Sequence, residues 1–527
     1  MKKNNIIKNA LLSVYDKSDI VKLAKNLILR NINIFSTGGT YKILKNSGIH
    51  CTEISDYTEF PEILHGKIKT LHPKVHGGIL AKEKIDEKII KQYKLINIDM
   101  VIVNFYPFQD FVENNNFTLD NAIEYIDIGG PAMVRSAAKN YKHVVVVVKI
   151  SDYQSIIEEM DNHQNTCTME KKFNLAISAF DYTAKYDHAI MKYFILSKKK
   201  LFTQKIKNIF PKNLNICFTK KQNLRYGENQ HQKSALYITS NLSNGCISNA
   251  KQIQGRLLSY NNILDAEIAL ECVKEFIEPS CVIVKHGNPC CVATKNNILE
   301  AYLCAYNSDR LSAFGGVIAF NRILDQKTIQ EIVDNHFVEV IVAPNIHEDA
   351  LKIIFIKKNI RILLSGNWKK NINTLEYKSI KGGLLVQEID YDNNNIDNWN
   401  IVTIRQPNQK ELNDAHFAWK IVKYVKSNAI VYVYNHTTIS IGAGQMSRVY
   451  ATKIANMKAI DTNISTKNAI MASDAFFPFH DSIDIAAESG ISCIIQPGGS
   501  IRDHEVIEAA NQYNISMIFT GCRHFKH

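Results

Sequence analysis

A lysine and a histidine stand next to each other at the end of an apolar run, in residues 282–291 (VIVKHGNPCC). The β-branched residues before them predict a buried strand, and the Gly, Asn and Pro after them predict a turn. Lys285 and His286 could bind a metal, form an acid/base pair or lie in a turn without chemistry. Cys290 and Cys291 add a redox pair to these alternatives.

The spacing of these residues argues against zinc. A zinc deaminase needs the patterns H-x-E and P-C-x-x-C. Here Cys290 and Cys291 are adjacent, and no Glu lies two residues after His286. These positions also lack the usual ligand spacing of a tetrahedral zinc site. The eleven cysteines are scattered without the pairing of a disulfide scaffold, which fits a reducing compartment and argues against redox chemistry.

Glycine-bearing segments follow the predicted strands of the first 150 residues. STGGT (36–40) lies between a strand and a helix, where backbone N–H groups can hold a phosphate, although a plain tight turn fits as well. It matches neither a dinucleotide fingerprint nor a P-loop. GKIKTLHPKVHGG (66–78) adds three lysines and two histidines, and Pro73 is expected to exclude a regular helix through its middle. Together the two segments predict an anionic substrate.

Further polar and aromatic segments recur later in the chain. LRYGENQHQ (224–232), IGAGQMSR (441–448) and QPGGSIRD (496–503) each carry an arginine beside a glycine turn. SDAFFPFHDSID (473–484) places three phenylalanines around a proline. This segment fits either a loop that caps the core or an aromatic slot for a planar heterocycle.

Alternating strand and helix patterns must position these segments. We expect strands at 10–16, 31–36, 98–108 and 143–149, with helices at 19–30, 40–48 and 120–140, the last broken at Gly-Gly. Near-continuous apolar strands separated by helices predict a parallel α/β sheet. Residues 151–200 are predicted to be helical, and the basic stretch 197–213 is the predicted linker.

The remainder of the chain hints at an internal duplication. SCVIVKHGNPC (280–290) and SNAIVYVYNHT (427–437) are both β-rich. Each precedes a glycine-bearing segment, at 312–316 and 441–445 respectively. This pattern predicts a repeated α/β unit.

Composition places the chain among globular proteins, with 46% hydrophobic and 22% charged residues and a net charge of +12. The charge could indicate nucleic-acid binding or anionic substrates, but richness in Lys, Asn and Ile also follows from A/T-rich codons. No nucleic-acid-binding signature, signal peptide or membrane span is visible. We expect a cytoplasmic protein that binds neither nucleic acid nor membrane.

The motifs occur in the order expected for one family. The segments are SVYDK (13–17), STGGT, KTLHP (69–73), NFYPF (104–108), IDIGGPAMVRSAAKN (126–140), RYGENQHQ, VKHGNPC, AFGGVIAF (313–320), KSNAIV (426–431), GAGQMSRV, SDAFFPF, QPGGSIRD and RHFKH (523–527). Over essentially its whole length the chain resembles the bifunctional purine biosynthesis proteins. These join phosphoribosylaminoimidazolecarboxamide formyltransferase to IMP cyclohydrolase.

The resemblance implies a methylglyoxal-synthase-like parallel-sheet core at about 1–149 within a cyclohydrolase domain at 1–199. It implies a formyltransferase domain at 200–527 built from two cytidine-deaminase-like α/β subdomains. The expected activity is transfer of a formyl group from 10-formyltetrahydrofolate to the 5-amino group of the carboxamide ribotide, followed by dehydrative closure to IMP. We expect small nucleotide substrates, a homodimer and no required metal; the sequence does not determine whether a monovalent cation is bound.

For formyl transfer, the resemblance assigns the acid/base roles to Lys285 and His286. The lysine's charge is expected to keep His286 a neutral base, and Lys285 can protonate the leaving folate or stabilise the oxyanion. Asn428 joins them as a catalytic residue. The expected substrate-binding residues are Arg225, Tyr226, Asn288, Gly315, Gly316, Gln445, Arg448, Asp474, Phe476, Phe477, Arg523, Phe525 and His527.

For ring closure, proximity within one substrate molecule does most of the chemistry. By resemblance, the catalytic residues are Lys69, Tyr106, Asp127 and Lys139. The expected substrate-binding residues are Lys17, Ser36, Thr37, Gly39, Thr40, Lys67, Thr70 and Asn104. Many relatives carry Arg where this chain has Lys67, and lysine lacks the forked donors of arginine. A weakened cyclohydrolase is therefore one alternative, and a zinc nucleobase deaminase is the other.

Overall fold

The chain divides into two compact units, Met1–Leu214 and Asn215–His527, which are described separately. The computed structural model describes residues 6–82, 85–114, 118–201, 210–239, 242, 244–368, 375–390 and 398–527. Residues 202–209 of the predicted linker at 197–213 lie outside the described residues, and the predicted domain boundary at 199/200 falls in the last turn of a helix that ends at Leu201. No helix in the described part of the chain is long and apolar enough to cross a membrane.

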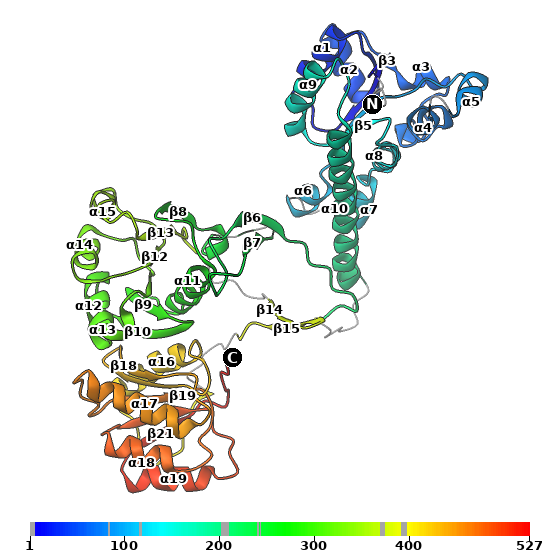
Figure 1. Ribbon diagram of the computed structural model, residues 1–527. Helices are drawn as coiled ribbons and strands as arrows, with labels where there is room; N and C mark the ends of the chain where they lie inside the picture. Colours follow the sequence, from blue (N-terminus) through cyan, green and yellow to red (C-terminus); the bar gives the residue numbers. More distant parts are fainter. Residues whose placement is uncertain are drawn as a thin grey trace. The chain divides into compact units, whose positions relative to one another are not determined.

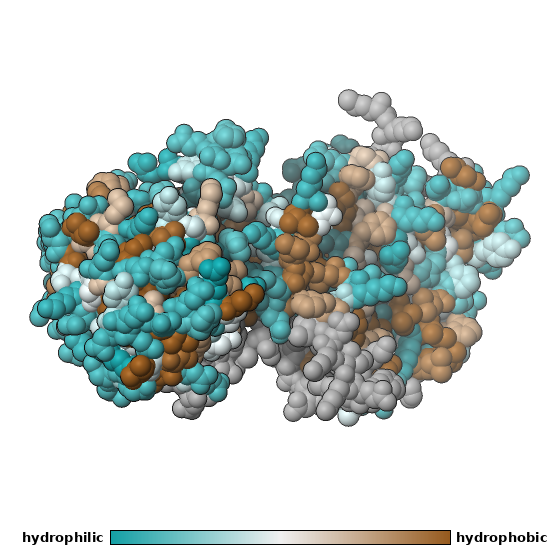
Figure 2. Space-filling view, turned by 90° about the horizontal axis from the view of Figure 1, so that it is seen from below, coloured by the Kyte–Doolittle hydropathy of each residue, from teal (hydrophilic) through white to brown (hydrophobic). Residues whose placement is uncertain are grey.

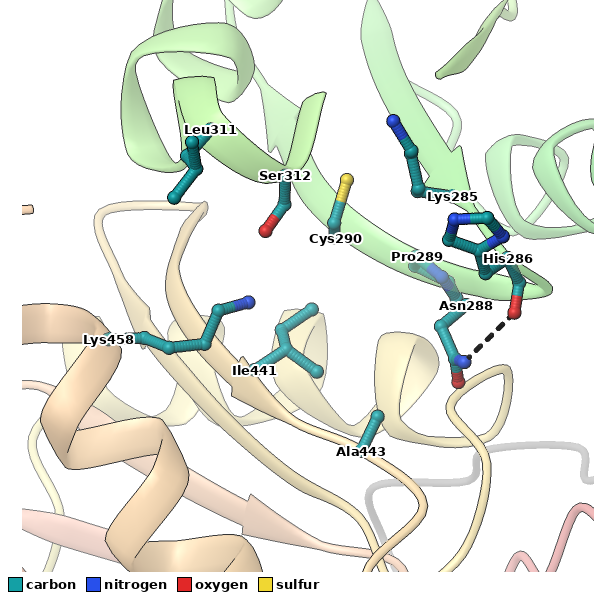
Figure 3. A pocket seen from close by; sticks show the side chains of 10 residues that line it. All are labelled: Lys285, His286, Asn288, Pro289, Cys290, Leu311, Ser312, Ile441, Ala443 and Lys458. Atoms are coloured by element: carbon teal, nitrogen blue, oxygen red, sulfur yellow. Dashed lines mark hydrogen bonds between the residues drawn. The ribbon is translucent and has the colours of Figure 1, made fainter. Parts of the chain in front are cut away.

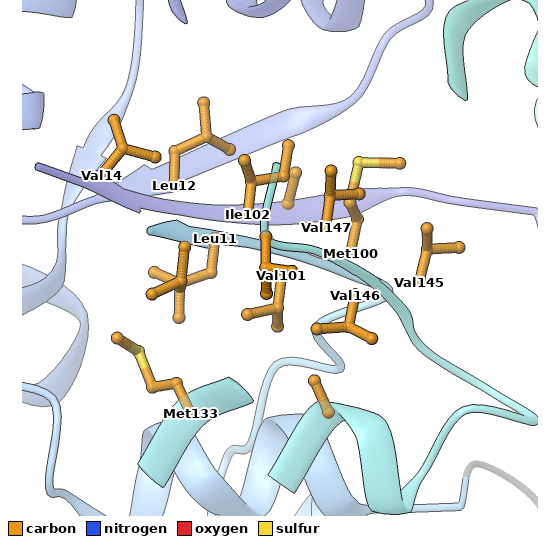
Figure 4. Close-up of a cluster of buried hydrophobic side chains, with 14 of the residues drawn as sticks. Leu11, Leu12, Val14, Met100, Val101, Ile102, Met133, Val145, Val146 and Val147 are labelled. Atoms are coloured by element: carbon orange, nitrogen blue, oxygen red, sulfur yellow. The ribbon is translucent and has the colours of Figure 1, made fainter. Parts of the chain in front are cut away.

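Unit 1 is built on a five-stranded sheet in the order β3-β2-β1-β4-β5, with every pair of neighbours parallel. Its strands are β1 (Asn9–Val14), β2 (Asn33–Ser36), β3 (Thr52–Glu53), β4 (Met100–Asn104) and β5 (Val145–Val147). Strand residues such as Leu11, Val101 and Val146 are fully or almost fully buried and pack against Met133 of a helix (Figure 4). The apolar runs therefore form the central strands that the sequence predicts.

Helices surround this sheet and continue into a long C-terminal helix (Figure 1). They are α1 (Ile20–Leu29), α2 (Gly38–Asn46), α3 (Ile54–Thr58), α4 (Pro73–Leu80), α5 (Glu87–Gln92), α6 (Phe108–Asn114), α7 (Leu119–Glu124), α8 (Gly129–Lys139), α9 (Tyr153–Asn162) and α10 (Met169–Leu201). As expected, no helix runs through Pro73; it begins α4, because the missing N–H of proline costs nothing in the first turn of a helix. The helix expected at 120–140 is broken, but at 125–128, and the pair Gly129–Gly130 opens the second helix, α8.

Unit 2 contains one continuous twelve-stranded sheet in the order β16-β21-β20-β19-β17-β18-β10-β9-β11-β12-β13-β8. Its first half has β8 (Lys251–Gln254), β9 (Ser280–Lys285), β10 (Asn288–Thr294), β11 (Val317–Phe320), β12 (Val340–Ala343) and β13 (Arg361–Leu364). Its second half has β16 (Asn400–Ile401), β17 (Ile430–Tyr434), β18 (Thr437–Gly442), β19 (Ile470–Ser473), β20 (Cys493–Gln496) and β21 (Ser516–Phe519). The strand order of the second half mirrors that of the first across the contact between β10 and β18.

The helices repeat in the same order. The first half has α11 (Tyr260–Val273), α12 (Ile298–Ser308), α13 (Arg310–Ala313), α14 (Gln326–Asn335) and α15 (Glu348–Ile354). The second half has α16 (Gln409–Val422), α17 (Arg448–Asp461), α18 (Asp481–Glu488) and α19 (Asp503–Gln512). The predicted duplication is confirmed, but the paired glycine segments are not equivalent. Residues 312–316 precede β11, whereas 441–445 follow β18, so their similarity is coincidental.

Two small antiparallel hairpins complete unit 2: β6 (Thr219–Asn223) with β7 (Ala235–Ile238), and β14 (Leu375–Ile380) with β15 (Gly383–Glu388). The β14–β15 hairpin carries exposed apolar side chains from Tyr377 to Leu385. Two segments between elements, 369–374 and 391–397, lie outside the described residues, so part of the Asn-rich stretch 393–400 has no structural account here.

Candidate functional sites

The β9–β10 turn presents Lys285 and His286 at one edge of the large sheet. The turn has two residues, His286 at φ +51° and Gly287 at φ +75°, as tight hairpins of primed type require. The ammonium of Lys285 donates to the carbonyl oxygen of Phe314 and lies over the Phe314 ring, 5.9 Å from its centre. The predicted strand therefore does end in a turn that delivers the two side chains together.

A cavity of about 310 Å³ opens between the two halves beside this turn. Figure 3 shows that its walls come from both halves of the sheet. The lining residues are Lys285, His286, Asn288, Pro289, Cys290, Leu311, Ser312, Ile441, Ala443 and Lys458. The Lys458 ammonium lies 2.8 Å from the carboxylate of Asp309 and so joins the halves on the far wall. The volume lies at the lower end of the range for small-molecule pockets.

The cavity exists because β10 and β18 pair at one end only. Ala293 pairs with Thr437, and the Thr438 hydroxyl bridges to the backbone of Val292. At the other end the two strands are not paired, and Pro289 has no N–H to offer there. The halves thus separate toward the edge that carries Lys285.

The loop before β17 closes that edge. The Asn288 side-chain oxygen accepts a 2.9 Å bond from the N–H of Lys426, and Asn428 donates its side-chain amide to the Gln445 carbonyl at 2.8 Å. Predicted residues from both halves, Asn288 in one and Asn428 with Gln445 in the other, are brought together here. Gly315, at φ +70°, lies so close to Lys285 that an added Cβ would stand 3.4 Å from the ammonium nitrogen.

Some predicted binding residues are buried. Arg448 is 7% exposed; it bonds Ser473, Asp474 and, at 2.7 Å, the Asn428 side chain. The guanidinium of Arg448 is therefore occupied by protein partners, and its bond to Asn428 orients that side chain. Asp474 is fully buried in the same network and also accepts from Ser427.

Phe477 is fully buried in the core, which favours the core-capping alternative for this residue, while Phe476 remains 38% exposed. A Cβ on Gly316 would press against the Ala313 and Val284 carbonyls, so this glycine serves close packing of the chain.

The remaining predicted residues lie on surface segments of unit 2. The Arg225 guanidinium stacks over the Tyr226 ring, 5.3 Å from its centre, and Arg225 donates its N–H to Leu258 just before α11. At the C-terminus, the Arg523 guanidinium lies 4.5 Å from the Phe525 ring centre, and that ring contacts His527 edge-on. The tail is tied to the site, because His524 donates its N–H to Asp474 and Ser427 donates its N–H to Lys526.

A second cluster forms where the strands of unit 1 end. The carboxyl ends of parallel strands share one edge, which is where ligand sites form in such sheets. After β2, the Thr37 hydroxyl bonds Ser13, and α2 begins at Gly38; Ser36 points inward, with its hydroxyl on the Leu12 carbonyl. After β1, Lys17 donates to the Val14 carbonyl and, at 3.2 Å, to Thr40. After β4, Asn104 accepts from the Tyr15 and Asp16 amides.

Two lysines meet the helix N-terminus at this edge. A Cβ on Gly38 would stand 2.4 Å from the Lys69 ammonium nitrogen, and Gly39 packs against Lys17. Burial lowers the pKa of Lys17, and the nearby positive charge of Lys69 lowers it further. Lys69 has Glu62 at 3.1 Å. Two ammonium groups beside the first turn of α2 form a site suited to a phosphate.

The acid and the aromatic residues of unit 1 lie across the same edge. Asp127 accepts from Gly130 at 2.9 Å, and Gly129 lies against the Thr70 hydroxyl. Burial raises the pKa of Asp127, and burial and then the Asp127 charge raise the pKa of Tyr106. The Tyr106 ring lies tilted against the Tyr15 ring, with 4.8 Å between their centres.

Residues of α10 that the sequence analysis did not select hold these loops. The Tyr182 hydroxyl accepts from the Phe105 amide at 3.0 Å, and the Tyr186 hydroxyl accepts from the Asp127 amide at 2.8 Å. Their three- to four-residue spacing on a helix was the only sequence signal, and it is the ordinary signal of a buried face.

Two predicted residues behave differently from the rest of this cluster. Lys139 is exposed and is the last residue of α8. The first turn of α8 touches Thr70, so Lys139 lies about 15 Å from Thr70 along the helix axis. Within a single chain, Lys139 therefore does not reach the cluster. Lys67 lies at the rim and pairs with Glu124 at 2.5 Å.

These features are those of a mixed α/β enzyme with lysines gathered at the strand ends of a parallel-sheet unit and a Lys–His pair beside a cavity in a duplicated unit. Comparison with known proteins agrees. The family model of the AICARFT/IMPCHase bienzyme matches residues 137–458, and that of the MGS-like domain matches residues 19–132. The chain belongs to the AICARFT/IMPCHase bienzyme family, whose two activities are the last two steps of IMP biosynthesis.

The curated relatives are similar over their full length. The bifunctional purine biosynthesis protein PurH of Buchnera aphidicola subsp. Schizaphis graminum (strain Sg) is 58% identical over 530 residues, with 100% of each chain covered. The protein of the same name from Buchnera aphidicola subsp. Acyrthosiphon pisum (strain Tuc7) is 56% identical over 528 residues, again with 100% of each covered. A solved structure described as that of ForH is 32% identical; it covers 36% of this chain and 99% of its own, with a TM-score of 0.33.

Proposed function

We propose that unit 2 transfers the formyl group and that Lys285 and His286 carry out this step. The observation that carries the assignment is that both side chains line one cavity, at the end where the two halves separate. Asn288 fastens the turn of one half to the loop of the other, which brings Asn428 to the same edge. An amine and an acyl donor bound in this cavity would meet a base and an ammonium together.

His286 takes the proton of the substrate's 5-amino group as that nitrogen bonds the formyl carbon. The tetrahedral oxyanion forms beside the Lys285 ammonium, which lies next to Gly315 and the Phe314 carbonyl. The bond between the formyl carbon and N10 of the donor then breaks, and a proton passes to N10. Arg448 keeps Asn428 in place for the carboxamide.

The formyl donor is a folate-type co-substrate, and we propose 10-formyltetrahydrofolate. Arg225, Tyr226, Phe476 and the tail residues Arg523, Phe525 and His527 are proposed to contact substrates from the protein surface. Their exposed charged and aromatic groups suit a phosphate and flat rings.

Unit 1 is proposed to close the ring. Lys17, Thr37, Gly39 and Thr40 surround the N-terminus of α2 and would hold the phosphate. The carboxamide nitrogen attacks the formyl carbon of the same molecule, and water leaves. Lys69 and Tyr106 would stabilise the oxygen and move protons, with Asp127 on the attacking amide.

We also propose a cytoplasmic homodimer. Exposed apolar side chains give a second copy surfaces to cover: Tyr450, Met457 and Ile460 on α17 are each at least 60% exposed. Figure 2 shows apolar patches among hydrophilic surface on the face in view. Sedimentation equilibrium should give twice the chain mass of 59.9 kDa; a monomer at micromolar concentration would contradict this proposal.

The test follows IMP formation from the carboxamide ribotide and 10-formyltetrahydrofolate. The wild-type chain is expected to form IMP without added metal. Formyl-ribotide that accumulates without IMP would refute the proposed roles in unit 1. Lys285→Leu should stop formyl transfer while the same sample still closes supplied formyl-ribotide, and loss of both reactions would contradict two separate sites.

A further inference from the structure

The turn that carries His286 is held from behind by a carboxylate on α11. The Asp265 side chain accepts a 2.7 Å bond from the Gly287 amide. The His286 amide also interacts with this carboxylate. Both N–H groups of the two-residue turn thus face one carboxylate, and such charge-assisted bonds are stronger than bonds between neutral groups.

Asp265 stands on a rigid support. Helix α11 begins with a reciprocal capping box between Ser259 and Asn262, and its buried face packs into the core beside β9. Asn262 also donates to Glu339 at 2.8 Å, which ties the start of the helix to the strand edge. A carboxylate fixed in this way determines where the turn, and with it the imidazole, can lie.

In the second half of the sheet an aspartate holds the equivalent turn, but that turn carries no proposed catalytic residue. Asp414 occupies the equivalent position in α16, whose capping box joins Asn408 and Glu411. Its two oxygens accept from the Asn435 and His436 amides at 2.8 and 2.7 Å. These two residues also have positive φ and form the β17–β18 turn. That turn lies at the opposite edge of the sheet, beside Thr294.

We infer that Asp265 is a positioning residue for formyl transfer: it holds the His286–Gly287 turn so that the imidazole faces the cavity. The inference rests on the proposed role of the Lys285–His286 pair. Asp265 acts through the turn and does not touch the substrate. Its loss therefore lowers the turnover number and leaves substrate binding in place.

The test uses the full chain and compares Asp265→Leu with Asp414→Leu. Asp265→Leu is expected to lower kcat of formyl transfer at least 30-fold, with KM for the ribotide within threefold and ring closure unchanged. Asp414→Leu removes two bonds from a more buried site, so it should cost at least as much stability in urea, yet leave kcat within threefold. Asp265→Asn and Asp414→Asn, which keep an acceptor oxygen, repeat the comparison if either leucine variant does not fold.

A second arm separates positioning from general damage. In a His286→Asn background, Asp265→Leu is expected to change the residual rate less than threefold, because its effect passes through His286. The inference is overturned if Asp265→Leu keeps kcat, if it raises KM alone, if the Asp414 variants lose kcat equally, or if the losses multiply in the double variant. Wild-type turnover and its loss in His286→Asn test the proposed function independently.

Discussion

The two halves of the large sheet make the same turn twice, and only one copy carries the side chains proposed to be catalytic. In the first half, Lys285 enters the turn and His286–Gly287 form it; in the second, Tyr434 enters and Asn435–His436 form it. Both turns demand positive φ at two residues, and both rest on an aspartate from the preceding helix. The backbone device is therefore structural, and the activity depends on which side chains the device presents.

What surrounds each turn also differs. Beside Lys285 the strands β10 and β18 separate and leave a cavity, whereas the β17–β18 turn lies where these strands pair. The positions next to the turns account for part of this difference: Thr438 bridges the strands with its hydroxyl, and Pro289, its counterpart, cannot donate an N–H.

Exchanging the turn residues is the strongest way to break the comparison. His286→Asn gives the first turn the residue of the second, and asparagine accepts positive φ readily, so stability should be unchanged. Formyl transfer should fall by about 10²–10⁴-fold, the usual loss of a general base. The measurement is the formyl-transfer rate alongside a urea unfolding curve. Asn435→His is the matched control, and a comparable loss there would contradict the assignment.

A methyl group at Gly315 should have the next largest effect. Gly315→Ala strains a position at φ +70° and puts a Cβ 3.4 Å from the Lys285 nitrogen. We expect formyl transfer to fall by about 10- to 100-fold, because relief of the strain would shift the neighbouring Phe314 carbonyl that holds Lys285, and misplacement of a catalytic group by about 1 Å costs that order. Gly382→Ala in the β14–β15 turn is the control: Gly382 has φ +78°, so the backbone is strained in the same way, but no atom lies within 4 Å of the added Cβ. Equal losses in both would mean that Lys285 need not be held by this contact.

Removing the bridge between the halves should affect stability more than rate. Thr438→Val keeps the shape but leaves the Val292 amide without its acceptor. We expect the unfolding free energy of unit 2 to fall by about 1–3 kcal/mol. Urea unfolding followed by far-UV circular dichroism measures it, with the half-buried neighbour Thr437→Val as the control. An unchanged midpoint would show that the side-chain bridge is dispensable.

The smallest effects concern pH, and they should have opposite signs in the two halves. Glu267 on α11 and His416 on α16 occupy equivalent positions. Burial raises the pKa of Glu267 and lowers the pKa of His416 to about 4. Folding therefore favours the neutral form of each. As pH falls from about 6.5 to 4, His416 takes up a proton in the unfolded chain but not in the folded chain, so stability is lost. Glu267 has the opposite effect: stability is lost as pH rises above the pKa that Glu267 has in the unfolded chain.

Neutral variants test these signs. His416→Gln should gain stability relative to wild type below about pH 6.5, and Glu267→Gln should gain above about pH 4.5. Because each substitution removes one titrating group, the gain in unfolding free energy is at most about 1.4 kcal/mol per pH unit. The gain is smaller for the partly exposed histidine ring. Unfolding midpoints from pH 4 to 8 measure both. Parallel slopes in variant and wild type would refute the assigned neutral state.

Much of the fold was predictable because apolar runs and turn residues act locally. The strands around Leu11, Val101 and Val146 follow from β-branched and apolar runs, and the duplication follows from two similar strand segments. The positions of element ends depend on context. The break expected at Gly129–Gly130 lies just before this pair, which opens a helix, as Pro73 also does.

Which of the predicted site residues lie together was easier to predict than how each side chain is oriented. Lys285, His286 and Asn288 line one cavity, and Lys17, Thr40 and Lys69 gather at one strand edge, as the motifs indicate. Arg448 and Phe477 are buried, because a motif records which residue is present and not which way it points. Asp265 could not be selected from sequence: a single acid on an amphipathic helix has no distinguishing pattern, and its partner amides lie across a tertiary contact.

The single-ended pairing of β10 and β18 has a mechanical consequence. The cavity walls belong to two halves whose strands pair at Ala293–Thr437, while side-chain contacts such as Lys458–Asp309 and Asn288–Lys426 join them beside the cavity. A change of side-chain volume at the paired end would alter the angle between the strands without replacing any lining residue. Selection for a larger or smaller substrate could therefore act on the contact between Val292 and Thr438, away from the residues proposed to perform the chemistry.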